Sequence, residues 1–332
     1  MSKRDAAIDI AKAIGILLMI LGHCNGLPHL VRNFIFSFHM PLFFILSGYF
    51  YKPKNLKDVV IGGNKHLVKP YLITSFFCIF LCLTACDLNL AEAKIIGMIM
   101  SNGGWANEMF GATLPYIGPI WFFLALYWCK IFYAYLRQRT EKCLFFSFVI
   151  STIALVIGKY IVNLPLGILT GFCGMVFYSM GDYWNRKMKE PIKTPYLIIS
   201  LIVWALCIWK AHLELASFDC NLYPISMFAA FIGTYFTYLV SKKFPSFLHP
   251  IFIWIGQNTL LILCYHTLSF FIMLNIKHYY FEPNKIILHG ITNSIISYTL
   301  SLGLPYLHTI IWKQFAKRRV CQHFDTPSCE KM

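Results

Sequence analysis

Long apolar stretches separated by short polar segments follow one another along the whole chain. A helix needs about 20 mostly apolar residues to cross the hydrocarbon of a bilayer. Ten stretches approach that length, at roughly 6–24, 33–51, 70–87, 116–136, 143–163, 165–184, 195–211, 223–241, 250–275 and 286–312. The pattern therefore predicts an all-α, polytopic membrane protein, a bundle of about ten transmembrane helices in a lipid bilayer.

The distribution of Lys and Arg gives this bundle an orientation. With a cytoplasmic N-terminus, the inner segments hold 21 of the 29 basic residues and the outer segments hold five. Since cytoplasmic loops carry such an excess, we expect both termini in the cytoplasm and a multi-pass protein of the inner (plasma) membrane. We assign 1–312 to one transmembrane domain and 313–332 to a basic cytoplasmic tail. The long outer loop, about 88–115, is expected to be a flexible cover.

The start of the chain superficially resembles a secretory signal, with Lys3 and Arg4 before an apolar stretch. Asp5, Asp9 and Lys12 interrupt the stretch, and no small-residue cleavage site follows it. We therefore expect this segment to be the first transmembrane helix.

Composition supports the membrane interpretation and excludes two other classes of protein. The chain is 58% hydrophobic and 13% charged, whereas soluble domains carry about 25% charged residues. The net charge of +15 does not indicate nucleic-acid binding, because the basic residues lie between apolar stretches. The twelve cysteines form no CxxC pair and no Cys/His cluster, so neither a disulfide scaffold nor a metal site is expected.

The first helix carries the densest set of polar residues inside a predicted span. At 100° per residue, Asp5, Asp9, Lys12 and His23 fall within about 60° of one another on one helix face. Ionisable groups in a span are costly and mark functional sites, although Asp9 and Lys12 can also simply neutralise each other. Lys12 and His23 are about 16 Å apart along the axis, a spacing that suits a long donor with an anionic head and a reactive tip.

Three histidines are predicted to lie at similar depth near the outer surface: His23, His39 in the second helix and His266 in the ninth. Together they indicate a shared cavity. Each one taken alone also fits a structural hydrogen-bonding role, and three histidines can ligate a metal, but no carboxylate accompanies them in the spans. Histidine is the natural general base for a hydroxyl acceptor, because its ordinary pKa of about 6.5 leaves it largely neutral.

Five segments resemble, in order, the acyltransferase 3 family of membrane O-acyltransferases, and within it the fucose 4-O-acetylase-like subgroup. They are KAIGILLMILGH (12–23), FHMPLFFILSGY (38–49), KHLVKPY (65–71), PIWFFLALY (119–127) and IGQNTLLILCYH (255–266). The first contains the basic residue, ten intervening positions and histidine that the family carries. The Phe-Arg-x-x-Arg pair that larger polysaccharide-modifying members show after the second helix is absent from this sequence.

The resemblance implies that acetyl-CoA is the donor substrate, reaching in from the cytoplasm, and that the acceptor is a glycan or lipid-linked sugar. No metal is expected. It implies that His23 is the catalytic histidine and that Lys12 supports the donor or the catalytic face. The helical rotation adds Asp9 to the candidate catalytic residues on that face. The donor or substrate pocket would include His39, Lys69, Trp121, Asn258 and His266. Trp121 also fits the interfacial aromatic belt.

Three alternatives remain open from the sequence. A covalent acyl intermediate can replace direct transfer, and a succinyl donor can replace an acetyl donor. The chain can also be an exporter of a lipid-linked glycan, in which the intramembrane charges form a pathway. The lack of an internal repeat argues against the exporter.

Overall fold

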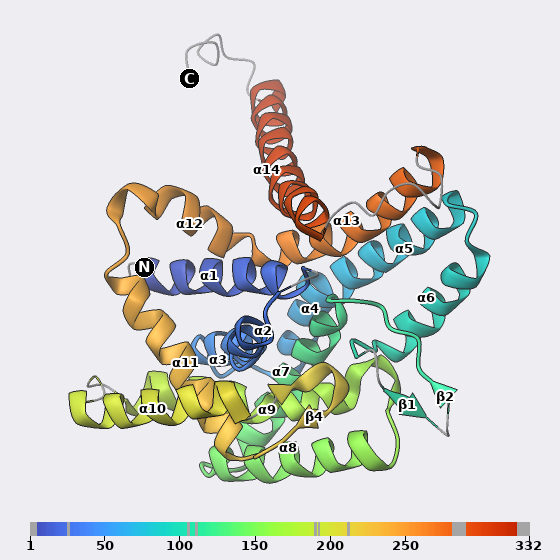
Figure 1. Ribbon diagram of the computed structural model, residues 1–332. Coiled ribbons are helices and arrows are strands. Elements are labelled where there is room, and N and C mark those ends of the chain that lie inside the picture. Colours follow the sequence, from blue (N-terminus) through green and yellow to red (C-terminus); the bar gives the residue numbers. More distant parts are fainter. Residues whose placement is uncertain are drawn as a thin grey trace.

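The computed structural model describes residues 5–24, 27–104, 107–109, 112–188, 191, 193–210, 213–280 and 290–323 and is almost entirely helical (Figure 1). The helices are α1 (Ala6–Gly22), α2 (His29–Phe36), α3 (His39–Tyr49), α4 (Leu56–Gly63), α5 (Lys69–Thr84), α6 (Leu88–Met100), α7 (Trp121–Arg139), α8 (Cys143–Tyr160), α9 (Ile168–Lys187), α10 (Thr194–Lys210), α11 (Ile225–Lys242), α12 (His249–Gln257), α13 (Thr259–Tyr280) and α14 (Gly290–His323). A π-helical turn, Asn64–Val68, joins α4 to α5.

Two short antiparallel hairpins complete the described part of the chain. Strand β1 (Glu108–Met109) pairs with β2 (Ala112–Thr113), and β3 (Leu213–Glu214) pairs with β4 (Asp219–Cys220). A 3₁₀ turn, Leu215–Ser217, closes the second hairpin. Two further 3₁₀ turns, Pro165–Gly167 and Ser246–Leu248, precede α9 and α12.

Helix α1 lies in the interior of the bundle, packed against α3, α11, α12 and α13 (Figure 1). Its N-terminus is capped by Asp5, whose carboxylate accepts a hydrogen bond of 2.9 Å from the backbone N–H of Ala7. Apolar residues such as Ile8, Ile16 and Ile20 are buried along its length. Neighbours on several sides hold α1 in place, and with it the residues that follow its last turn.

Helices α3 and α9 approach each other more closely than side chains would allow. A Cβ atom on Gly48 would overlap the carbonyl oxygen of Tyr178, and one on Gly181 would overlap the carbonyl oxygen of Ile45. The two backbones are therefore in direct contact, as small residues permit in membrane helix pairs. This seam fixes the position of α3, the helix that begins with His39.

A Gly48→Ala substitution is expected to destabilise the protein by about 1–3 kcal/mol, because the added methyl group must push two backbones apart. Gly303→Ala is the matched control, since nothing lies within 4 Å of a Cβ placed there. Helix propensity alone favours alanine over glycine by about 1 kcal/mol, so the control should melt at or above the wild-type temperature. Thermal melting of the purified proteins in detergent measures both effects. If Gly48→Ala and Gly303→Ala melt at the same temperature, α3 and α9 do not pack backbone against backbone at Gly48.

The predicted spans correspond to helices, with two corrections. The second span (33–51) contains a two-residue turn at Ser37 and Phe38 between α2 and α3, yet His29–Tyr49 is one candidate membrane span. Pro41 lies in the first turn of α3, where a missing N–H is tolerated. The ninth span (250–275) is broken at Asn258, and the two parts are bent by 73°. The predicted flexible cover at 88–115 contains helix α6, because LNLAEAKIIGMIM is an apolar helix-forming stretch.

Length and hydropathy alone identify three helices among the described residues that can cross a membrane, or four if the bent pair forms one span. The ten spans, the cytoplasmic termini and the boundary at residue 312, which lies within α14, stay predictions. Lys3, Arg4, Lys189, Lys285, Lys331 and residues 286–289 and 324–332 lie outside the described residues, as do parts of the 88–115 loop.

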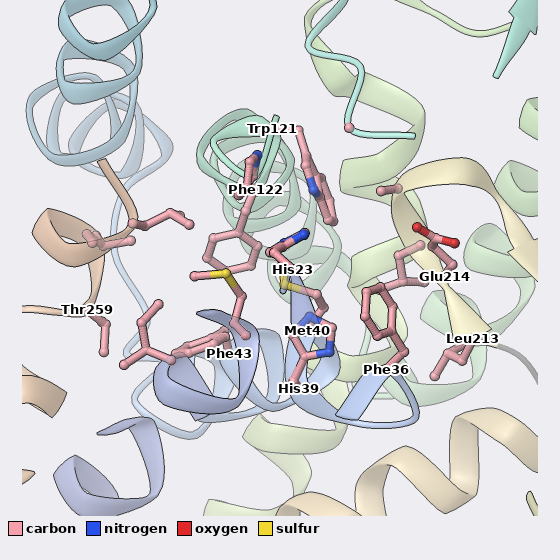
Figure 2. A pocket seen from close by; sticks show the side chains of 18 of the residues that line it. His23, Phe36, His39, Met40, Phe43, Trp121, Phe122, Leu213, Glu214 and Thr259 are labelled. Carbon is pink, nitrogen blue, oxygen red and sulfur yellow. The ribbon is translucent and has the colours of Figure 1, made fainter. Parts of the chain in front are cut away.

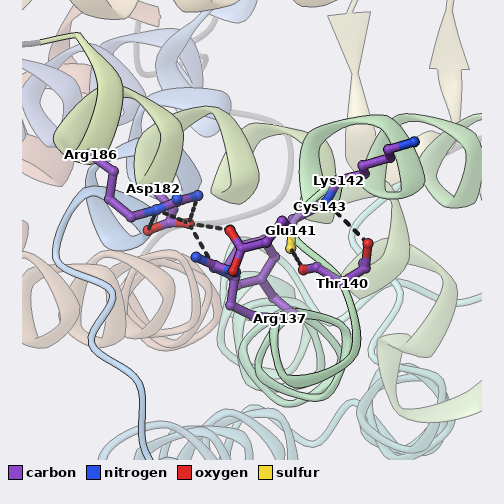
Figure 3. A network of polar contacts seen from close by, with 8 residues as sticks. Arg137, Thr140, Glu141, Lys142, Cys143, Asp182 and Arg186 are labelled. Atoms are coloured by element: carbon purple, nitrogen blue, oxygen red, sulfur yellow. Dashed lines mark hydrogen bonds and ion pairs between the residues drawn. The ribbon is translucent and has the colours of Figure 1, made fainter.

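A buried carboxylate joins α7 to α9 at the end of α9 (Figure 3). Both oxygens of Asp182 accept hydrogen bonds from Arg186, at 2.8 to 3.0 Å, and the Tyr133 hydroxyl donates to Asp182 at 2.5 Å. Arg137 lies 3.8 Å from the same carboxylate. Because Asp182 is only 1% exposed, these partners are needed to hold its charge inside the protein.

Candidate active site

Two cavities lie next to each other in the bundle. The first, the histidine cavity, contains about 780 Å³ of space that is not occupied by protein atoms and is partly open to solvent (Figure 2). It brings together residues from α1, α2, α3, α7, α13 and the 213–220 hairpin. Its lining is Ile16, Met19, His23, Arg32, Phe36, His39, Met40, Phe43, Gly103, Pro119, Trp121, Phe122, Leu213, Glu214, Leu215, Ala216, Thr259, Leu260 and Leu263.

His23 directly follows the last residue of α1 and is exposed to the cavity. Its ring is surrounded by other rings: Phe36 at 6.3 Å, Phe270 at 6.5 Å and His266 at 5.6 Å between centroids. The position at a helix end leaves the imidazole beyond the packed part of α1. His23 is therefore both held by aromatic neighbours and accessible to a molecule in the cavity.

His39 also lines this cavity, but it is buried. Its Nδ1 lies 2.9 Å from the carbonyl oxygen of Ile35. A carbonyl can only accept, so Nδ1 carries the proton and Nε2 is left as an acceptor. The sequence prediction that His23 and His39 share one cavity is in agreement with this geometry.

The lining of the histidine cavity also contains one acidic and one basic residue that the sequence analysis did not identify as site residues. Glu214 comes from the β3–β4 hairpin and Arg32 from α2, where its guanidinium lies 5.0 Å from the ring of Phe36. An ion pair of 2.9 Å between Lys159 and Asp219 connects this hairpin to α8. A carboxylate on a connection between helices gives no periodic signal in the sequence, so only the fold could reveal Glu214.

Trp121, at the start of α7, lines the same cavity and is nearly buried. Its indole lies against Gly103, where a Cβ atom would overlap the ring. The segment around Gly103 is held by Asn102, whose amide donates to the carbonyl oxygens of Gly104 and Leu114 at 3.1 and 3.0 Å. The structure therefore places Trp121 in the cavity wall. The sequence analysis left open whether this residue lines a pocket or belongs to the interfacial aromatic belt.

The second cavity, here the lysine cavity, is larger and contains about 1370 Å³ of empty space. Four lysines and a histidine contribute to its lining, together with one acidic residue: Lys12, Lys52, Lys54, Lys130, His66 and Asp58. The Lys12 ammonium lies 5.1 Å from the centre of the Phe50 ring. The excess of cationic groups makes this cavity a favourable place for a polyanion.

Four residues line both cavities: Phe43, Phe122, Thr259 and Leu260. The rings of Phe43 and Phe122 are 5.9 Å apart, and Thr259 is the first residue of α13, just after the helix break. These shared residues, three of which are apolar, form the partition between the lysine cavity and the histidine cavity. Lys12 and His23, both on or next to α1, lie on opposite sides of it.

Four other predicted site residues lie off both cavity linings. Asp9 is buried against α12, where Gln257 donates to it at 3.4 Å. Lys69 is exposed at the start of α5. Asn258 caps α12 by donating to the carbonyl oxygen of Trp254 at 2.7 Å. His266 lies beside His23 without lining the cavity.

Among the described residues, no three or more His, Cys, Asp or Glu side chains are grouped so that they could hold a metal ion.

The acyltransferase 3 family model, described as an acyltransferase domain, matches residues 5–310, nearly the whole chain. No curated protein and no solved structure matches.

Proposed function

The chain belongs to the acyltransferase 3 family and is an acyltransferase, and from that premise we propose that it moves an acetyl group from acetyl-CoA to a sugar hydroxyl. The acceptor is a sugar of a surface polysaccharide or a lipid-linked glycan, as in the fucose 4-O-acetylase-like subgroup. The observation that carries this proposal is the pair of adjoining cavities, one lined by lysines and one containing an accessible histidine.

The lysine cavity suits the donor. Coenzyme A carries phosphate groups at one end and its thioester at the end of a long, narrow arm. Lys12, Lys52 and Lys130 would neutralise the phosphates in the lysine cavity, and the arm would pass the partition at Phe43 and Phe122. The spacing of about 16 Å between Lys12 and His23 along a helix agrees with a donor that is held at one end and reacts at the other.

The histidine cavity suits the acceptor and the reaction. His23 would take the proton from the sugar hydroxyl as its oxygen attacks the thioester carbonyl. The new C–O bond forms, the C–S bond breaks, and the imidazolium returns the proton to the departing thiolate. Glu214 and Arg32 offer hydrogen bonds to sugar hydroxyls, and Trp121 and Phe36 offer apolar faces to the ring.

The predicted orientation supports a donor from the cytoplasm. Lys52 and Lys54 belong to a segment that the distribution of charges assigns to the inner side. The histidine cavity would then lie toward the outer side of the inner membrane, where glycans are modified. Membership in an acyltransferase family also favours the enzyme over an exporter.

A Lys130→Ala substitution is expected to raise the KM for acetyl-CoA by about ten- to a hundredfold, with kcat changed less, because a lost charge-assisted contact to phosphate is worth about 1.5–3 kcal/mol. Lys187→Ala is the matched control, since Lys187 is exposed at the end of α9 and lines neither cavity. Initial rates of coenzyme A release at varied acetyl-CoA concentration measure both variants. A KM as low as that of the control would remove Lys130 from the donor site.

Transfer itself is tested with acetyl-CoA labelled in the acetyl group and membrane vesicles that contain the glycans of the natural host. Label should enter the glycan fraction only when the protein is present, and mild alkali should release it, as expected for an ester of a hydroxyl group. Label that stays in the donor, or enters an alkali-stable product, would contradict O-acetylation.

A further inference from the structure

His266 lies directly beside His23, and one aromatic side chain contacts both. The two imidazole centroids are 5.6 Å apart, with their planes tilted by 34°. Phe270, one turn after His266 on α13, packs edge-on against His23 at 6.5 Å and against His266 at 4.9 Å. His266 is 1% exposed and lines neither cavity. It therefore contacts His23, the proposed base, but not a molecule in the cavity.

The two nitrogens of His266 have different surroundings. Nδ1 lies 3.0 Å from the hydroxyl oxygen of Ser301 on α14, a residue that is fully buried. Nε2 is buried and has no hydrogen-bond partner in the described part of the chain. A buried nitrogen without a partner is costly, so it requires an explanation, and His23 is the neighbouring side chain that can supply an N–H.

We propose that His266 is a positioning residue for His23. The Nδ1–H of His266 donates to the Ser301 hydroxyl oxygen, which leaves the lone pair of Nε2 directed to the His23 side. In the reacting complex, His23 donates its own N–H to that lone pair. Its other ring nitrogen then has a lone pair that faces the histidine cavity and can take the proton of the acceptor hydroxyl.

This arrangement fixes both the tautomer and the orientation of the base. In catalytic triads, the residue that hydrogen-bonds to the histidine has the same effect. The proton count balances: His23 is neutral before the reaction, becomes an imidazolium when it takes the acceptor proton, and passes it to the thiolate. His266 stays neutral throughout and only accepts. The proposal rests on the proposed role of His23 as the base.

The same contacts argue against His266 as the base itself. Its ring is enclosed by His23, Phe270 and Ser301, so an acceptor hydroxyl in the histidine cavity meets His23 first. His39, in contrast, lines the cavity itself, and its ring packs against Phe36 at 4.9 Å between centroids. The proposal therefore gives His39 no part in positioning His23.

The test compares His266→Leu, His266→Gln and Ser301→Ala with the wild type and with His23→Ala. The readout is transfer of labelled acetyl from acetyl-CoA to the glycan fraction of host membrane vesicles. His266→Leu should lower kcat at least a hundredfold with the KM for acetyl-CoA within about twofold, since the donor contacts are untouched. His266→Gln keeps an acceptor oxygen near the position of Nε2 and should recover activity to within about tenfold of wild type. Ser301→Ala should lower kcat by less than His266→Leu does.

The outcomes separate the two proposals. If His266→Leu and Ser301→Ala both keep wild-type kcat while His23→Ala is inactive, the positioning role is wrong and the function stands. If His266→Gln is no better than His266→Leu, the role is also wrong. If His266→Leu does not fold, an unchanged kcat in Ser301→Ala together with a hundredfold loss in His266→Gln overturns the role. If His23→Ala keeps its activity, the proposed function itself fails.

Discussion

Replacing His23 by alanine is expected to reduce acetyl transfer by about a thousandfold, within the range of 10²–10⁴ that a general base supplies. The side chain follows the end of α1 and is exposed to the histidine cavity, so its removal leaves the packed part of the helix intact. The KM for acetyl-CoA should change little, because the donor phosphates are assigned to the other cavity. Label transferred to glycan in membrane vesicles measures the loss.

His29→Ala is the matched control for this substitution. His29 is an exposed histidine at the start of α2 and lines neither cavity. This substitution removes the same chemical group, an imidazole, without changing the lining of either cavity. Transfer should match that of the wild type in the control; a comparable loss in both variants would show that the effect of His23→Ala is not catalytic.

The second large effect is expected at Asp182, where alanine should cost about 3 kcal/mol of stability. Removing one partner of a buried ion pair costs about 3–5 kcal/mol, because it leaves the other charge without compensation. The lower end applies here, since the Arg137 and Arg186 side chains are 16% and 31% exposed and can partly reach solvent. Thermal melting in detergent measures the change.

Glu141→Ala is the control that belongs to the same network (Figure 3). Glu141 pairs with Arg137 at 2.7 Å but is 81% exposed, and exposed ion pairs contribute little to stability. The control should melt close to the wild type. If the two variants melt at the same temperature, the buried carboxylate does not join α7 to α9 as described.

The sequence was most informative along α1. The 100° rotation per residue predicted that Lys12 and His23 lie on one face, and both do line cavities. The same argument placed Asp9 on that face; Asp9 lines neither cavity and accepts a hydrogen bond from Gln257 of α12. Helical periodicity gives only the direction of a side chain, and α1 has neighbours on several sides, so residues of one broad face can meet different partners.

Depth in the membrane was a weaker guide. It predicted that His23, His39 and His266 meet, and the structure does bring His266 next to His23. It could not tell that His266 lies behind the cavity wall, because depth contains no information about rotation around the helix axis. The bend of 73° after α12 further changes the direction of α13, and a hydropathy pattern does not register such a break.

The residues that the sequence missed come from two sources. Glu214 and Arg32 lie in connections between spans or next to them, where no periodicity directs attention to single positions. Lys52 and Lys54 were counted only as loop charges, although they line the lysine cavity. Lys130, which also lines the lysine cavity, could have been identified from the sequence, because a lysine within a predicted span is costly unless it faces a cavity.

The central claim is that the donor binds on one side of the partition and the acceptor reacts on the other, at His23. It is tested by transfer assays in sealed membrane vesicles of the two orientations, with labelled acetyl-CoA supplied outside. Label should enter glycan in inside-out vesicles, where the lysine cavity faces the added donor, and should be lost with His23→Ala. Transfer of equal rate in right-side-out vesicles, or transfer that persists in His23→Ala, would contradict the account.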